Sequence, residues 1–368
     1  MYHIAIDARV INSGTGDYVK HLLNGLQKVD NKNKYTVLVP SKDINYWSPT
    51  QPNFMVVAAD FDNYSFNEQI GFKKFLEDLS PDLVHFCMPQ QPIFYRGKRV
   101  TTMHDMTLLK TYNSDKNWLV FHAKQLVGRY VWRRVAKISD HVIAISETTK
   151  KEFQDLVTIP EEKISVVYEA STADKGSVRR YENLPFKDFI LYVGQQPDYK
   201  NIRRLGEAHQ KLLAKHPKLG LVLVGRLNPD TLANKAFFES KGYKNIHFTG
   251  FLPDEKRDWL FQQAKAYVFP SLMEGFGLPP LIAMDYGTPV VSSNASCMPE
   301  VLGDAAVYFD PLDTNDMANS IDKVLADDKL RDKLVKLGLA QVARYSWAKT
   351  AEQTHAIYMN ALKNSSER

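Results

Sequence analysis

Short apolar runs alternate with longer stretches of helical period along the chain, and this alternation limits its fold more than any other feature of the sequence. The runs at 83–86 and 266–269 are typical. Strands of parallel sheets are buried on both faces and therefore appear as continuous apolar runs, while the stretches between them suit crossover helices. The sequence therefore predicts an α/β protein built on doubly wound parallel sheets.

A polar stretch at 169–184, which has no apolar period, separates two groups of these runs. The first group predicts strands at 2–7, 35–39, 54–58, 83–86, 99–103, 141–145 and 164–168. The second group predicts strands at 189–193, 221–224, 246–248, 266–269, 289–292 and 306–309. Because 368 residues exceed one ordinary domain, we expect two wound domains with a ligand cleft between them. The polar stretch would link these domains, and a final helical segment would follow, which places the parts at 1–170, 171–346 and 347–368.

The charge balance and the cysteine content exclude several classes of protein. Lys and Arg number 47 against 42 Asp and Glu, a formal charge of +5 that is too mild for a nucleic-acid-binding surface. Cys87 and Cys297 are too few for a disulfide framework, as is usual in a reducing compartment. No run approaches about 18 apolar residues, and the first residues lack the pattern of a signal peptide. We therefore expect a cytoplasmic protein that does not span a membrane.

Several well-known catalytic patterns are absent from the sequence. It contains no G-x-x-x-x-G-K-[ST], no H-E-x-x-H and no G-x-S-x-G. P-loop, zincin and α/β-hydrolase chemistry are therefore not expected. No metal-binding cluster can be read from the sequence either.

The strongest local signal is the segment 269–287, in which a strand leads into a glycine-bearing loop. Two consecutive prolines then suit the first turn of a helix. The free amides of Gly277 and Leu278 would lie at this helix N-terminus, where a diphosphate could bind. Glu274 lies in the same loop, and because a phosphate would repel it, we expect it to accept hydrogen bonds from neutral hydroxyls. A capped turn with a solvated Glu274 is the alternative.

A second glycine loop, at 12–18, follows the first strand and precedes a helical stretch. Gly14 and Gly16 would let the backbone approach a ligand closely. The spacing does not complete G-x-G-x-x-G, so a dinucleotide fingerprint is not supported. A plain turn explains the loop equally well.

Polar residues also follow two other predicted strands. His104 and Asp105 come directly after the strand at 99–103, and Lys200 follows the strand at 189–193. The carboxyl ends of parallel strands are where open α/β sheets bind ligands, so His104 could face a substrate and Lys200 a phosphate. The alternatives are a helix cap at Asp105, a satisfied surface ring at His104 and a solvated Lys200.

The stretch from Lys116 to Ser139 carries six Lys or Arg and no acidic residue. Aromatic side chains are interleaved with these cations at roughly helical spacing. Basic amphipathic helices of this kind can lie on anionic bilayers, although such a face is equally often just solvated. An anionic membrane surface is therefore a candidate partner.

Many spaced motifs, in the right order over the whole chain, resemble the retaining GT-B glycosyltransferases of family 4, and in particular their mannosyltransferase-like members. The N-terminal half supplies Gly14-Thr-Gly16 with Tyr18, His104-Asp105-Met-Thr-Leu108 and Ile145-Ser146-Glu147. The C-terminal half supplies Tyr192-Val-Gly194, Lys200-Asn201, Thr249-Gly250-Phe251, Glu274-Gly-Phe-Gly-Leu-Pro279, Gly287-Thr-Pro289-Val-Val291, Pro299-Glu300-Val301 and Gly303-Asp304-Ala305-Ala306. The resemblance implies two Rossmann-like domains that face each other across a cleft, with the last helix crossing back to the N-terminal domain.

The resemblance also implies roles for single residues. The N-terminal domain would receive the acceptor, with Gly16 near the donor phosphates and His104 beside the sugar at the reacting face. In the C-terminal domain, Lys200 and the amides of the helix start would hold the diphosphate, and Glu274 would bind the sugar hydroxyls. The wider set that would border the donor, including its base at Phe251 and Leu252, comprises Gly14, Gly16, Gln195, Phe251, Leu252, Gly275, Phe276, Gly277 and Leu278.

Two positions depart from the family pattern. The second Glu of the family's E-x7-E motif falls at Ile282, and an isoleucine cannot accept hydrogen bonds from ribose hydroxyls. Many relatives also carry Arg shortly before the lysine, whereas this chain has Gln195, Gln196 and Tyr199 there. One charged hydrogen bond contributes about 1.5 to 3 kcal/mol, so we expect weaker donor binding rather than inactivity.

The implied function is a metal-independent, retaining hexosyltransferase. It would move a hexose, with mannose from GDP-mannose as one donor, onto a growing polysaccharide or a lipid-linked acceptor. It would work in the cytoplasm, where it could associate with the inner face of the membrane. One alternative is a non-catalytic partner of another transferase, and a second is a sugar phosphorylase or nucleotide-sugar epimerase on the same fold.

Overall fold

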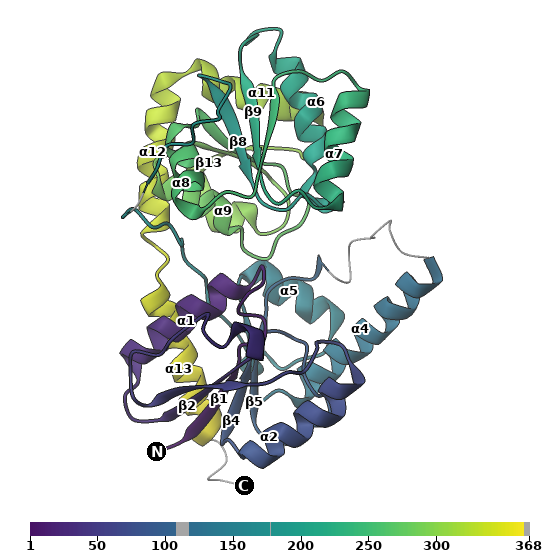
Figure 1. The fold of residues 1–368 in the computed structure, drawn as a ribbon, viewed down its shortest axis with the longest axis vertical. Helices are drawn as coiled ribbons and strands as arrows, with labels where there is room; N and C mark the ends of the chain where they lie inside the picture. Colours follow the sequence, from purple (N-terminus) through teal and green to yellow (C-terminus); the bar gives the residue numbers. More distant parts are fainter. Residues whose placement is uncertain (108–117, 177, 364–368) are drawn as a thin grey trace. The chain divides into compact units, whose positions relative to one another are not determined.

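The computed structural model describes residues 1–107, 118–176 and 178–363, with the side chains of 118–124 outside the description. The chain folds into two compact units, each a parallel sheet with helices on its faces (Figure 1). Unit 1 comprises Met1–Glu169 and Ser346–Arg368, and unit 2 comprises Ala170–Tyr345. These boundaries lie one residue from the predicted ones, and the predicted α/β class is confirmed.

Unit 1 contains a seven-stranded sheet in the order β3-β2-β1-β4-β5-β6-β7, in which every neighbouring pair is parallel. The order reverses between β1 and β4, so the topological switch point of this sheet lies there. Its strands are β1 (His3–Asp7), β2 (Lys34–Val39), β3 (Phe54–Ala58), β4 (Leu83–Phe86), β5 (Arg99–Met103), β6 (His141–Ala144) and β7 (Ile164–Val166). Its helices are α1 (Gly16–Val29), η1 (Ser41–Asp43), η2 (Glu68–Phe72), α2 (Lys73–Leu79), α4 (Trp118–Ile138), α5 (Glu147–Leu156), η3 (Glu161–Lys163) and α13 (Trp347–Lys363).

The C-terminal helix α13 belongs to unit 1 and packs beside α1 (Figure 1). A Cβ added at Gly25 of α1 would lie 2.5 Å from the Cβ of Ala351, so the missing side chain lets the two helices approach closely. Tyr358 shares a 2.5 Å hydrogen bond with Nδ1 of the buried His85 on β4. Lys98 donates to two carbonyls in the last turn of α13, which satisfies orphan acceptors at the helix end.

Unit 2 contains a six-stranded parallel sheet in the order β10-β9-β8-β11-β12-β13, with its switch point between β8 and β11. Its strands are β8 (Phe189–Val193), β9 (Gly220–Val224), β10 (Ile246–Gly250), β11 (Ala266–Phe269), β12 (Val290–Ser293) and β13 (Ala306–Phe309). Its helices are η4 (Asp198–Lys200), α6 (Ile202–Leu212), α7 (Pro229–Ser240), α8 (Asp254–Gln263), α9 (Leu278–Asp285), α10 (Met298–Leu302), η5 (Gly303–Ala305), α11 (Thr314–Ala326) and α12 (Asp328–Val342).

The stretch 169–184, expected to be a linker, is attached to unit 2 over most of its described length. Tyr181 is buried there, and its hydroxyl lies 3.0 Å from Nε2 of His247. The amide of Arg179 donates to the carbonyl of Glu255, which ties the stretch to α8. Local sequence did not reveal this attachment because the partners lie more than sixty residues away.

Strand ends differ from the predictions by a few residues. The strand expected at 289–292 begins at Val290, because Pro289 has no N–H to donate to a ladder. The strand expected at 164–168 ends at Val166, and the one expected at 246–248 continues to Gly250. Among the described residues, none of the helices combines the length and the apolarity that crossing a bilayer requires.

Candidate functional site

Two predicted site residues meet at the switch point of unit 2. Lys200 follows β8 and Glu274 follows β11, and because these parallel strands are neighbours, their carboxyl ends share one edge of the sheet. The Nζ of Lys200 lies 2.6 Å from Oε1 of Glu274, although the residues are 74 positions apart in the chain. Their side chains are 16% and 13% exposed, so the pair is largely shielded yet still reaches solvent.

The partner of Glu274 differs from the expectation that this carboxylate would face neutral hydroxyls. It accepts a charge-assisted hydrogen bond from the Lys200 ammonium, which is favoured where water screens the charges little. A carboxylate has about four lone-pair positions, so this bond leaves others for hydroxyl donors. The pair thus presents a cation beside an anion, which suits a ligand whose charged diphosphate is joined to a neutral sugar.

Asn201 fixes the backbone on which Lys200 stands, a role that was not predicted from the sequence. It adopts the left-handed conformation, with φ of 61°, at the N-cap of α6. Its side-chain amide donates to the carbonyls of Pro270 and Pro311, at 3.0 and 2.7 Å. Because Pro270 directly follows β11, this amide ties the Lys200 segment to the start of the Glu274 loop. Asparagine tolerates a left-handed backbone better than most residues, which is the local signal for this role.

The N-terminus of α9 offers the two amides expected from the sequence. Gly277 is its N-cap with φ of 88°, and a Cβ there would lie 2.5 Å from Cε of Met298, so only glycine fits without strain. The next two residues after Leu278 are prolines, which leaves the amides of Gly277 and Leu278 as the donors of the N-cap and first turn. The side chain of Phe276 is buried and packs edge-on against Tyr345. Its ring is therefore turned away from a ligand at the helix start.

The expected base-bordering residues follow β10 at the same edge of the sheet. Phe251 is 67% exposed, whereas Leu252 is nearly buried. The guanidinium of Arg226, which follows the neighbouring strand β9, lies 5.4 Å from the centre of the Phe251 ring. This cation–π pair was missed from the sequence because its members are distant in the chain. Gln195, which follows β8, is exposed, and its carbonyl accepts a hydrogen bond from the hydroxyl of Tyr192.

Two buried polar atoms near the switch point have no hydrogen-bond partner among the described residues. They are Nε2 of Gln196, in the loop after β8, and Oγ of Ser271, in the loop after β11. Such groups are costly unless a ligand or an ordered water satisfies them. Their position favours a polar ligand at this edge of the sheet.

The glycine loop of unit 1 contains two different kinds of glycine. A Cβ at Gly14 would meet nothing within 4 Å, so this position is open to a ligand. A Cβ at Gly16 would lie 2.0 Å from the carbonyl oxygen of Ile11, so the loop itself requires this glycine. The role of Gly16 near the donor phosphates stays a prediction, and the structure supplies an independent reason for its identity.

His104 is buried in unit 1 rather than exposed on its surface. Its Nε2 lies 2.9 Å from the carbonyl of Cys87, so Nε2 carries a proton and donates it to that acceptor. Nδ1 lies 3.3 Å from a carboxylate oxygen of Glu169, a partner that was not predicted. The ring also packs edge-on against Tyr18. Asp105 accepts from the amide of Thr107, and the residues of a helix that it could cap lie outside the described ones.

A buried charge cluster at the end of β1 was also missed. The guanidinium of Arg9 donates to Asp7 at 2.8 Å and to Glu68 at 2.9 Å, and it lies over the ring of Phe72. Burial raises the pKa of Glu68, even though Arg9 acts against this shift. The cluster anchors the end of β1, from which the glycine loop departs.

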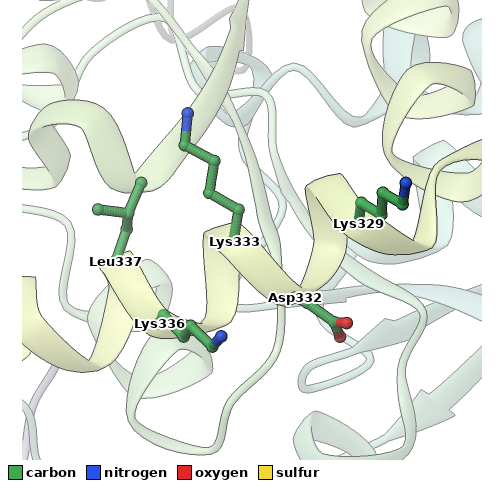
Figure 2. A pocket seen from close by; sticks show the side chains of 5 residues that line it. All are labelled: Lys329, Asp332, Lys333, Lys336 and Leu337. Carbon is green, nitrogen blue, oxygen red and sulfur yellow. The ribbon is translucent and has the colours of Figure 1, made fainter.

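A surface hollow on α12 of unit 2 is separate from these residues (Figure 2). It encloses about 510 Å³ and is lined by Lys329, Asp332, Lys333, Lys336 and Leu337. Figure 2 shows that Lys333 and Lys336 leave the helix in different directions, so their ammonium groups do not converge on a common ligand. We therefore do not include this hollow in the candidate site.

Known proteins similar to this chain give its family. Residues 12–170 match the family model described as Glycosyltransferase Family 4, and residues 178–340 match the one described as Glycosyl transferases group 1. The O-antigen chain mannosyltransferase B of Escherichia coli is 31% identical over 284 residues, which cover 73% of this chain and 72% of that protein. The chain belongs to glycosyltransferase family 4.

Two further similarities describe this family 4 chain. The serotype-specific mannosyltransferase WbdA of Escherichia coli is 28% identical over 399 residues, which cover 98% of this chain and 47% of WbdA. The chain thus spans about half the length of that relative. A sucrose-phosphate synthase from Thermosynechococcus elongatus superposes with a TM-score of 0.78 at 18% identity, covering 99% of this chain and all of the other. The predicted GT-B fold and the resemblance to mannosyltransferase-like members of the family are both confirmed.

Proposed function

We propose that the chain transfers a hexose from a nucleotide-diphosphate sugar to a growing polysaccharide or a lipid-linked acceptor. Mannose from GDP-mannose is the first donor to test, because two similar curated proteins are named as mannosyltransferases, one of them of an O-antigen chain. The observation that carries the proposal is the 2.6 Å contact between Lys200 and Glu274 at the switch point of unit 2. The helix start at Gly277 and Leu278 lies three to four residues beyond Glu274 in the same loop.

The proposed chemistry assigns each group one task. As the bond between the sugar's anomeric carbon and the diphosphate oxygen breaks, negative charge develops on the leaving group. The Lys200 ammonium and the amides of Gly277 and Leu278 would stabilise this charge, and Glu274 would orient the sugar through its hydroxyls. In a retaining reaction without a metal, the acceptor hydroxyl would attack from the leaving-group face and pass its proton to the departing diphosphate. His104 would lie beside the sugar.

The first test is incubation of the protein with UDP-, GDP- and dTDP-sugars, with and without a chelator and a glycan acceptor. We expect transfer from at least one donor, unchanged by the chelator, with the anomeric configuration retained in the product by NMR. Glu274→Gln should lower turnover severely while the melting temperature stays close to that of the wild type. Absence of both hydrolysis and transfer from every donor would contradict the proposal.

A non-catalytic role as the partner of another transferase is the second candidate. It is favoured by Ile282, which stands within α9 with a nearly buried side chain that cannot accept a ribose hydroxyl. Calorimetry that finds no nucleotide-sugar affinity, together with tight binding to a second transferase, would support this role. Release of a sugar phosphate, or donor epimerisation without an acceptor, would instead indicate a phosphorylase or an epimerase.

We also propose a cytoplasmic location with peripheral attachment to an anionic membrane through α4. The predicted basic stretch begins at Lys116, which lies outside the described residues, as do the side chains of 118–124. Further along α4, Leu126, Val127 and Tyr130 are exposed. These three apolar side chains could enter the acyl-chain region of a bilayer, while Arg133 and Lys137, further along the same helix, would face the anionic headgroups. The C-terminal part of α4 also borders a hollow of about 580 Å³, which is lined by Arg133, Ala136, Lys137, Leu156, Val157, Thr158, Pro160 and Lys163.

Vesicle sedimentation tests this attachment. We expect the protein to pellet with vesicles that contain an anionic lipid and to stay in solution with neutral ones. Arg133→Glu combined with Lys137→Glu should abolish the pelleting, because the two changes reverse charges that line the hollow. Equal pelleting with both kinds of vesicle, or with neither, would contradict this part of the proposal.

A further inference from the structure

The loop after β12 holds the backbone of Glu274 through one hydroxyl group. Oγ of Ser296 donates to the Glu274 carbonyl at 2.7 Å, and the Glu274 amide donates to the same Oγ at 3.2 Å. The thiol of Cys297 donates to the same carbonyl at 3.3 Å. One side chain therefore contacts both the N–H and the C=O of the residue whose carboxylate meets Lys200.

The backbone conformation of Ser296 would suit glycine better, so the presence of a serine side chain needs another explanation. Its φ is 56°, in the left-handed region that non-glycine residues rarely adopt. Glycine would occupy this conformation without cost, so the position gains nothing from a side chain on conformational grounds. The amide of Ala295 donates to Oγ of Ser293, which steadies the base of the loop. The serine at 296 is thus explained by the bonds of its hydroxyl to Glu274.

We propose that Ser296 is a positioning residue for the transfer reaction, acting through the main chain of Glu274. This inference rests on the proposed function, in which the Glu274 carboxylate orients the sugar. A Glu274 peptide that can rotate would let the carboxylate drift from its 2.6 Å contact with Lys200 and from the hydroxyls it binds. Misplacement of a substrate-orienting group by about 1 Å can lower a rate by about 100-fold.

A pair of substitutions at this position separates positioning from stability. Ser296→Gly relieves the backbone strain but removes the hydroxyl, so we expect an unchanged or higher melting temperature and a kcat at least about 10-fold lower. Ser296→Thr keeps the hydroxyl but puts a β-branched residue at positive φ, so we expect a lower melting temperature with turnover closer to the wild type. If Ser296 only stabilised the fold, activity would follow stability, and Ser296→Thr would be less active than Ser296→Gly.

Ser80 provides a matched control in unit 1. It also has a left-handed backbone, with φ of 48°, and its hydroxyl donates to the carbonyl of Glu77 at 2.7 Å, at the end of α2. Ser80→Gly therefore removes the same kind of bond from the same kind of backbone, away from the Glu274 loop. We expect wild-type kcat and KM in this variant.

Hydrogen exchange of the peptide that contains Glu274 gives a readout that does not need activity. We expect the Glu274 amide to exchange faster in Ser296→Gly than in the wild type, with no change there in Ser80→Gly. Unchanged exchange in Ser296→Gly, or a wild-type kcat in that variant, would overturn the inference. A wild type that is inactive with every donor would refute the proposed function instead, and the exchange result would still decide whether Ser296 holds Glu274.

Discussion

Replacing Gly277 by alanine tests whether the backbone at the start of α9 binds the donor diphosphate. At φ of 88°, an alanine would be strained by about 1 to 2 kcal/mol, and its Cβ would lie 2.5 Å from Cε of Met298. Because that methyl ends a flexible side chain, we expect the free energy of unfolding to fall by about 1 to 3 kcal/mol in total. If this strain misaligns one amide against a charged ligand, binding should weaken by about 1.5 to 3 kcal/mol. The Kd for the nucleoside diphosphate should therefore rise about 10- to 150-fold.

Gly287, at the other end of α9, is the control for this experiment. It has φ of 75°, and a Cβ there would lie at an ordinary 3.7 Å from Cγ1 of Val335. Gly287→Ala should therefore cost a similar backbone strain without touching the amides of the helix start. Denaturant unfolding would compare the stabilities of the two variants, and calorimetry would compare their Kd values. A Gly277→Ala variant that binds the diphosphate as tightly as Gly287→Ala would refute the reasoning.

Substitutions at three other positions, one of them with a control variant, test single side chains. Lys200→Met should weaken nucleoside diphosphate binding about 10- to 150-fold by calorimetry, and an unchanged Kd would exclude Lys200 from the site. Arg226→Ala, which removes the cation beside Phe251, should raise the same Kd about 2- to 5-fold, whereas Lys241→Ala, at another cation–π pair of unit 2, should not change it. Burial lowers the pKa of His85 from 6.5 to about 3, so the unfolded chain binds its proton first as the pH falls. Stability should therefore be full above pH 6.5 and drop by up to about 1.4 kcal/mol per pH unit below it, and urea titrations should show a shallower drop in His85→Gln.

The sheets were predictable because strands that are buried on both faces are mostly apolar, with few polar exceptions such as His85. The run at 266–269 became β11 without a change of bounds, and the turn into α9 followed from a glycine and two prolines. Pro289 was wrongly assigned to the strand because the assignment used apolar character alone and ignored that proline has no N–H to donate. The stretch 169–184 contains the boundary between the units, as expected, but most of it packs onto unit 2, because Tyr181 is held by a partner far away in the sequence.

Within the candidate site, local patterns identified the residues but not their partners. Lys200 and Glu274 were each singled out by position after a strand, yet their 2.6 Å contact depends on the strand order β8-β11, which no local pattern contains. The roles of Asn201, Arg226 and Ser296 were missed because each acts on residues that are far away in the sequence. Their bonds come from neighbouring strand ends, so they became visible only once the order of the sheet was known.

Calorimetry can measure the Kd of GDP, UDP and dTDP and, separately, the Kd of the nucleoside of each. The difference within each pair is the affinity that the strand ends of unit 2 provide for the phosphates. We predict that at least one diphosphate binds at least about 10-fold more tightly than its nucleoside, and that Lys200→Met removes most of this difference. Equal Kd values for every diphosphate and its nucleoside, or a difference that persists in full in Lys200→Met, would contradict the assignment of this edge of the sheet to a donor diphosphate.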